Sequence, residues 1–346
     1  MSSTTTTQKA LLLESKQGKF VVGSRDIPKP GPGELLVKVL ATGLNPVDWK
    51  IQKYGIFVTE FPAVLGTDLA GTVEVVGEGV TSFKKGDRVF AQGTFDSNFA
   101  SFQQYALTYA ATTAKIPMKF SYEDVATIPV ALTAAYVGLY NTKPYGLQLA
   151  RPTESANHGK YAGKPIIVLG GSSSVGQFVI ELAKLSGFSP IIATASLKHT
   201  EFLKSLGATH VLDRNLATDM LKTEIKKLTT MPIDIVYDAI SLATTQQTGN
   251  DLLVPGGSLV TVLNLAITKN KFVGHTQVYG ILRLPQNKEL LEGLYAKLTH
   301  YLEQGMIIPN RVQLLAGGLE GIVEGLKEME NDRVSGVKLV VRPWET

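Results

Sequence analysis

The chain has 346 residues, 44% of them hydrophobic, and this length exceeds what one hydrophobic core usually supports. The formal net charge is only +4 and no long block of like charge occurs, so neither nucleic acid nor a membrane is an expected partner. The absence of cysteine excludes disulfides, zinc–thiolate sites and a cysteine nucleophile. The polar first eight residues and the lack of a membrane-spanning apolar run predict a cytoplasmic protein.

Histidine gives no sign of a metal site. The five histidines show none of the close pairing that metal sites use: His158, His199, His210, His275 and His300. A site built from distant histidines and carboxylates has nothing in the sequence to support it, so we predict no metal.

The first third of the chain reads as short strands separated by glycine and proline, which predicts a small, irregular β-barrel. The expected strands cover 10–13, 20–22, 34–40, 73–76, 87–90 and 103–107. One helix start interrupts them, with Asn45 as N-cap, Pro46 in the first turn and Asp48 at the third position. Capping is a sufficient explanation for Asn45 and Asp48, but it does not explain Lys50.

The pattern becomes helical from Tyr122. Residues 130–140 are apolar nearly all round, which predicts a buried helix. Residues 142–164 are polar and rich in glycine and proline, as expected of a long loop that leads into the next strand.

A strand, a glycine turn, a helix and a second strand then follow in the order that a dinucleotide site requires. The first strand is 165–169, the helix 177–185 ends at Gly187, and the second strand is 189–195. The turn reads Gly171-x-Ser173-x-x-Gly176, so a serine replaces the middle glycine of the usual fingerprint and can donate its hydroxyl to phosphate. The alternative is a simple Gly/Ser turn.

The residues of this turn exclude two other kinds of site. A phosphate-binding P-loop needs lysine after the last glycine, but Gly176 is followed by Gln177 and Phe178. A nucleophile elbow needs glycine two residues on either side of a serine, and none of Ser172, Ser173 and Ser174 has this.

The end of the second strand indicates the cofactor. An NAD site places a carboxylate there for the ribose, whereas this chain has Ser196, Lys198 and His199. A hydroxyl and an ammonium favour a 2′-phosphate, so we predict NADP(H). The alternatives are a solvated lysine and a surface histidine.

The remaining elements alternate, which predicts a parallel, doubly wound sheet. The expected helices are 200–206, 218–227, 288–303 and 318–330, and the expected strands are 210–212, 233–237, 257–263 and 337–341. We expect the last strand to return to the first domain.

Five motifs in this order resemble the zinc-free medium-chain dehydrogenases/reductases: 43–50, 65–71, 85–90, 170–176 and 317–321. Among these the chain is most similar to fungal ToxD-like, trans-acting enoyl reductases, with quinone oxidoreductases as cousins. The resemblance implies a GroES-like β-barrel domain (1–128), a Rossmann domain (129–300) and a C-terminal return (301–346), with NADPH in the cleft. Thr67 and Asp68 occupy the positions at which zinc alcohol dehydrogenases have His-Glu, so the resemblance does not predict zinc-dependent alcohol oxidation.

The resemblance also implies site residues. Related enoyl reductases have a functional lysine at Lys50, which would stabilise the enolate that forms when hydride reaches the β-carbon; an exposed helix lysine is the alternative. Tyr54, one turn along, is a second candidate donor. The expected cofactor residues are Asn45, Thr133, Gly171, Ser172, Ser173, Ser174, Val175, Gly176, Ser196, Lys198, His199, Asp238 and Leu263.

Two of these residues have plain alternatives. Thr133 matches a family position at the nicotinamide, but its hydroxyl is equally suited to bond the backbone carbonyl one turn back. Asp238 follows the fourth strand and is equally suited to cap the strand end. Asn45 matches a second position at the nicotinamide pocket.

Three functions stay open, and we favour the first. They are NADPH-dependent reduction of the activated C=C bond of enones, enoyl thioesters or quinones; NADPH-dependent reduction of aldehydes or ketones; and a non-catalytic, NADPH-binding partner that docks to a polyketide synthase. The expected mouth of the pocket is formed by 91–102, 142–164 and 264–285, with Phe57, Phe95 and Tyr279 as either pocket or core residues. Both a monomer and a homodimer fit the resemblance.

Overall fold

The computed structural model describes residues 6–152, 154–157, 159–268 and 272–346. The chain forms two compact units. Unit 1 comprises Met1–Val130, Tyr295–Glu303 and Pro309–Thr346, and unit 2 comprises Ala131–Leu294 and Gln304–Ile308. The boundary between the units therefore falls inside two helices, α3 (Pro129–Tyr140) and α8 (Pro285–Glu303).

Unit 1 is built on two β-sheets. A seven-stranded sheet has the order β15-β16-β3-β5-β6-β8, with β7 paired to β3, and a three-stranded sheet has the order β2-β1-β4. The strands are β1 Thr7–Leu13, β2 Phe20–Asp26, β3 Glu34–Gly43, β4 Ala63–Val64, β5 Asp68–Val76, β6 Arg88–Gln92, β7 Tyr105–Tyr109, β8 Thr113–Lys115, β15 Val312–Leu314 and β16 Lys338–Val341. The six strands predicted for the first third are confirmed, whereas β4, β8 and β15 are too short for the sequence pattern to indicate.

The last strand returns to unit 1, as predicted. β16 pairs with β3 in antiparallel register, with Val340 opposite Gly43. The pairing brings Lys338, at the start of β16, next to the residues that follow β3.

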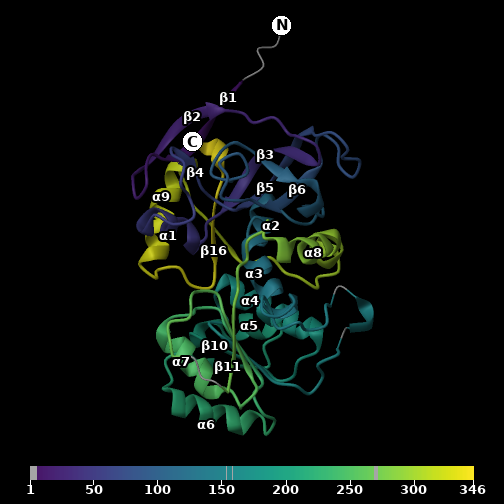
Figure 1. Cartoon of the computed structure of the whole chain (residues 1–346), viewed down its shortest axis with the longest axis vertical. Helices are drawn as coiled ribbons and strands as arrows, with labels where there is room; N and C mark the ends of the chain where they lie inside the picture. The colour runs from purple at the N-terminus through teal and green to yellow at the C-terminus, as the bar shows by residue number, and fades with distance from the viewer. Residues whose placement is uncertain (1–5, 153, 158, 269–271) are drawn as a thin grey trace. The chain divides into compact units, whose positions relative to one another are not determined.

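Helices α1 (Pro46–Tyr54) and α9 (Gly318–Glu330) pack against each other in unit 1 (Figure 1). α1 begins as predicted, because the carboxylate of Asp48 accepts a hydrogen bond from the backbone N–H of Asn45 at 2.8 Å. It ends at Gly55, whose φ of 63° is the left-handed conformation that favours glycine. Side chains from both helices meet Leu44, which precedes α1, in one core: Ile51, Leu319, Ile322 and Leu326.

Unit 2 contains a six-stranded sheet in which every pair of strands is parallel, with the order β11-β10-β9-β12-β13-β14. The strands are β9 Ile166–Leu169, β10 Ile191–Ala195, β11 His210–Asp213, β12 Ile235–Asp238, β13 Ser258–Thr261 and β14 Gly274–Gln277, and the helices between them are α4 Ser174–Ser186, α5 Thr200–Leu206, α6 Thr218–Leu228 and α7 Ala243–Leu252 (Figure 1). The doubly wound parallel sheet is confirmed. The order of the strands reverses between β9 and β12, which is where such sheets bind ligands.

Two elements of unit 2 were not predicted from the sequence. α7 buries Gln246, Gly249 and Asn250 beside Leu252, so it carries no apolar stripe of helical period. β14 lies within 264–285, which was expected to form the mouth of the pocket. Within the described residues, no helix is both long and apolar enough to cross a membrane.

Candidate cofactor and active sites

The glycine turn of unit 2 allows close approaches at the start of α4. A Cβ atom on Gly171 would lie 2.8 Å from the Cβ of Ala193, and a Cβ on Gly176 would lie 2.3 Å from the carbonyl oxygen of Gly170. Both glycines are therefore required for close packing of helix and strand, which is their role in dinucleotide-binding turns.

The N-terminus of α4 leaves backbone donors free. Ser173 is the N-cap, and its Oγ accepts a hydrogen bond from the N–H of Gly176 at 3.0 Å. Across the described parts of the chain, the N–H groups of Ser174 and Val175 have no hydrogen-bond partner. These two donors and the hydrogen of the Ser173 hydroxyl suit a pyrophosphate, so the turn fits a dinucleotide.

Asp238 shapes the loop that follows β12. Its Oδ1 accepts the backbone N–H groups of Ile240 (3.0 Å) and Ser241 (2.8 Å), and its Oδ2 accepts the hydroxyl of Thr245 (2.7 Å). Burial raises the pKa of Asp238, while these hydrogen bonds oppose the shift. Both carboxylate oxygens are thus engaged, and this is the geometry of a strand-end cap.

Helix α3 carries a buried hydroxyl without a partner. Thr133 is 1% exposed, and within the described residues its Oγ1 makes no hydrogen bond, so the alternative bond to the backbone carbonyl one turn back is not formed. The hydroxyl of Tyr237 donates to the carbonyl oxygen of Ala134 at 2.8 Å and ties α3 to β12. An orphaned buried hydroxyl is costly unless a ligand completes it, which suits the predicted contact with a carboxamide.

The end of β10 carries an exposed cation and a buried imidazole. Lys198 is exposed on the short turn Leu197–His199, whereas His199 is only 5% exposed. His199 is therefore not a surface histidine, and we leave it out of the proposed phosphate site.

Arg214, near the end of β10, was not among the candidate phosphate-binding residues predicted from the sequence. Its backbone N–H donates to the carbonyl oxygen of Ala195 at 3.0 Å, and its side chain is exposed. The neighbouring Asp213 turns its carboxylate toward its own loop, where it accepts the N–H of Asn215. The usable signal was the parallel pairing of β10 with β11, because the ends of adjacent parallel strands meet at one edge.

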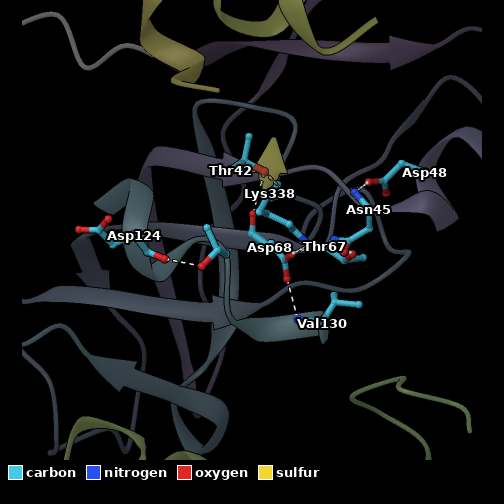
Figure 2. Close-up of polar contacts among 10 residues, drawn as sticks. Thr42, Asn45, Asp48, Thr67, Asp68, Asp124, Val130 and Lys338 are labelled. Atoms are coloured by element: carbon cyan, nitrogen blue, oxygen red, sulfur yellow. Dashed lines mark hydrogen bonds and ion pairs between the residues drawn. The ribbon is translucent and has the colours of Figure 1, made fainter. Parts of the chain in front are cut away.

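Unit 1 contains a buried polar network centred on Asp68, the first residue of β5. Figure 2 shows Asp68 between Lys338, Asn45 and Val130. Its Oδ2 accepts from Lys338 Nζ (2.9 Å) and Asn45 Nδ2 (2.8 Å), and its Oδ1 accepts the backbone N–H of Val130 in the first turn of α3 (2.7 Å). Asn45 also accepts a hydrogen bond from Lys338 at 2.5 Å, so both ends of its amide are bonded within the protein.

The network surrounds the start of α1. Asn45, the N-cap of α1, is 4% exposed, and Asp48 is fully buried. Burial raises the pKa of Asp48 to about 7; the charge of Asp68 also raises it, and that of Lys338 lowers it. The position of α1 is therefore fixed by a buried cluster of charges.

The residues at this place do not fit a zinc ion. The chain offers no cysteine, and Thr67 and Asp68 occupy the positions expected for His-Glu. Both oxygens of Asp68 already accept hydrogen bonds, and the ammonium of Lys338 compensates its charge. Across the described residues, no group of three or more metal-binding side chains occurs.

Lys50 lies on the second turn of α1 and is half-buried. Its Nζ lies 5.4 Å from the ring centroid of Trp49. Burial lowers the pKa of Lys50, and the charge of Asp332 opposes the shift. Tyr54, at the end of the helix, is 54% exposed. A half-buried ammonium with a lowered pKa can donate a proton more readily than a solvated lysine.

The predicted site residues divide between the two units. Asn45, Lys50 and Tyr54 belong to unit 1, and the others to unit 2. In unit 2, the glycine turn and the loop after Asp238 lie on either side of the point where the strand order reverses. The carbonyl oxygen of Leu263, beyond β13, accepts the hydroxyl of Thr261 at 3.0 Å.

This combination defines a GroES-like domain joined to a Rossmann-type domain. Residues 31–118 match the alcohol dehydrogenase GroES-like domain, and residues 174–284 match the zinc-binding dehydrogenase domain. The trans-enoyl reductase resD of Aspergillus sclerotiorum is 33% identical and covers 93% of this chain and 96% of its own. The chain belongs to the medium-chain dehydrogenase/reductase family and is an oxidoreductase of that family.

Other relatives belong to this family, and solved structures share its fold. Further trans-enoyl reductases are among the relatives, and so is a zinc-type alcohol dehydrogenase-like protein of Schizosaccharomyces pombe, 32% identical over 96% of this chain and 99% of its own. A mycobacterial protein solved with NADPH has a TM-score of 0.77 at 22% identity, covering 97% of this chain and 100% of that one. A quinone oxidoreductase shares the same fold.

Proposed function

We propose that this protein is an NADPH-dependent, zinc-independent reductase of carbon–carbon double bonds conjugated to a carbonyl. The observation that carries the proposal is that both carboxylate oxygens of Asp68 are engaged by Lys338, Asn45 and Val130, which does not suit a zinc ligand. Without a Lewis acid, a side chain must stabilise the charge that develops on the carbonyl oxygen. Lys50 is suited to this because burial lowers its pKa.

The cofactor is held by the residues of unit 2. The N–H groups of Ser174 and Val175 and the hydroxyl of Ser173 bind the pyrophosphate. Lys198, Arg214 and Ser196 would hold the 2′-phosphate. The hydroxyl of Thr133, which lacks a partner, would hold the nicotinamide carboxamide. When bound, NADPH supplies a hydride.

Lys50 then acts on the substrate. As hydride reaches the β-carbon, the electron pair of the double bond moves toward the carbonyl oxygen, and Lys50 donates a hydrogen bond to the enolate. A proton subsequently reaches the α-carbon, either from this ammonium or from water. Tyr54 is a second donor on the same helix.

A second function has one observation in its favour. The relative from Schizosaccharomyces pombe is described as zinc-type alcohol dehydrogenase-like, which favours reduction of an aldehyde or ketone. The likeness to trans-enoyl reductases supports the first proposal, and we include enoyl thioesters among its substrates.

The test is NADPH consumption over enones, enoyl thioesters, quinones and saturated aldehydes, with NADH in parallel. We expect turnover on the enones and thioesters, preference for NADPH, and a saturated carbonyl product by mass spectrometry. Alcohol formed with the double bond retained would replace this proposal by carbonyl reduction. Tight NADPH binding without turnover on any substrate would favour a docking protein.

A further inference from the structure

Phe57 occupies an unfavourable turn directly after α1. Its φ is 65°, in the left-handed region that aromatic residues rarely adopt. The N–H of Val58 donates to the carbonyl oxygen of Ile56 at 2.9 Å, which closes a three-residue turn around Phe57. Turns of this kind with positive φ are rare and strained. Glycine would remove the strain, so the phenyl side chain is kept at a cost to stability.

That strain does not serve to bury the ring. Phe57 is 56% exposed, and it stacks on Phe95 with ring centroids 5.2 Å apart and planes 11° from parallel. Phe95 in turn packs against the core of unit 1 that contains Leu44 and Ile51. The two rings therefore form a supported aromatic platform, defined here as Phe57 and Phe95, with much of the outer ring open to solvent.

The platform adjoins the helix that carries Lys50. Lys50 and Tyr54 are one turn apart on α1, about 6 Å along the helix axis, and Phe57 follows the end of the helix. Tyr54 and Ile56 are also exposed, at 54% and 38%. Lys53 is engaged by Glu330 at 2.7 Å. Tyr279, the third aromatic residue considered from the sequence, belongs to unit 2 and is not part of the platform.

We propose that this platform determines specificity by stacking with a planar, apolar substituent on the β-carbon of the substrate. The inference rests on the proposed function, in which Lys50 takes the carbonyl end. A substrate held by Lys50 then extends past Tyr54 to Phe57. Aromatic faces favour flat apolar groups through offset stacking, so aryl-substituted enones are preferred over small ones.

The experiment uses the full chain with two enones that share a methyl ketone, 3-buten-2-one and 4-phenyl-3-buten-2-one. We expect Phe57→Ala and Phe95→Ala each to lower kcat/KM for the phenyl enone by roughly tenfold, mainly through KM, since one aromatic pair contributes about that factor. The small enone should change less than twofold. Met118→Ala, at an apolar position 86% exposed in unit 1, is the matched control.

Phe57→Gly separates recognition from folding. Glycine accepts the positive φ, so this variant should melt at the same or a higher temperature and yet lose the preference for the phenyl enone. An unchanged ratio of kcat/KM for the two enones in all three variants would overturn the platform.

Binding of 4-phenyl-3-buten-2-one, measured by calorimetry, tests the platform without turnover. If the wild-type protein reduces no enone, the proposed function fails, and a Kd that is equally strong in Phe57→Ala overturns the platform as well. A weaker Kd in Phe57→Ala supports the platform in either case.

Discussion

Lys338 Nζ lies 2.9 Å from Asp68 Oδ2, and the two side chains are only 2% and 0% exposed. The pair joins the first residue of β16 to the first residue of β5, and both side chains hold the amide of Asn45 at the start of α1. A buried ion pair of this kind contributes little net energy while intact, but losing one partner leaves an uncompensated charge.

Lys338→Met should lower the free energy of unfolding by about 3–5 kcal/mol, because it leaves the buried carboxylate of Asp68 without a compensating charge. Urea unfolding measures this loss. The double variant Asp68→Asn/Lys338→Met should recover part of it, as a double-mutant cycle requires of a coupled pair. Equal stability of Lys338→Met and the wild-type protein would mean that the pair is not buried in solution.

The stability of the protein should depend on pH through Asp48, whose pKa burial raises from 3.8 to about 7. The folded state then binds this proton more tightly than the unfolded chain, so Asp48 contributes stability at low pH that is lost as pH rises through about 7. Relative to Asp48→Asn, the wild-type free energy of unfolding should fall between pH 5 and 7, at most by roughly 1.4 kcal/mol per pH unit. The exposed Asp234→Asn should run parallel to wild type. If Asp48→Asn kept the wild-type slope between pH 5 and 7, Asp48 would be excluded as the cause.

Lys50→Ala should lower kcat for enone reduction by about a hundredfold, in the range of a lost general acid, while NADPH binding changes little. Lys53→Ala is the matched control, because Lys53 lies on the same helix, is exposed and pairs with Glu330. Since burial lowers the pKa of Lys50, the wild-type rate should fall at high pH as its ammonium loses the proton. A similar loss in both variants would assign the effect to the helix surface rather than to Lys50.

Lys198→Ala and Arg214→Ala should each raise KM for NADPH roughly tenfold and leave KM for NADH within twofold, because only NADPH carries the 2′-phosphate. Steady-state kinetics with both cofactors measure the ratio. Lys204→Ala removes an exposed lysine that pairs with Glu201 and serves as the control. A parallel rise in KM for both cofactors would place these cations elsewhere on the dinucleotide.

The sequence predicts those helices whose ends are marked by residues that begin or end helices. The helices 200–206 and 318–330 have the expected bounds, and Gly207 and Gly187 end α5 and α4 as expected. α7 escaped prediction because its buried face includes Gln246, held at both ends by loop backbone atoms that no periodicity reveals.

The polar network was beyond sequence reasoning for a different reason. A lysine in a strand is expected to face solvent, and the burial of Lys338 depends on the register of β16 with β3. Lys50 and the glycine turn could be proposed from the sequence because they sit in local motifs. Arg214 was missed because its relation to Ser196 comes from the pairing of two strands.

The Asp68–Lys338 pair can form only late in the synthesis of the chain. A ribosome makes Asp68 tens of seconds before Lys338, at the usual rate of about 5–20 residues per second. During that interval the carboxylate of Asp68 lacks the ammonium of Lys338, with which it pairs in the folded protein. The nascent unit 1 therefore cannot complete its buried network until the strand that carries Lys338 has emerged.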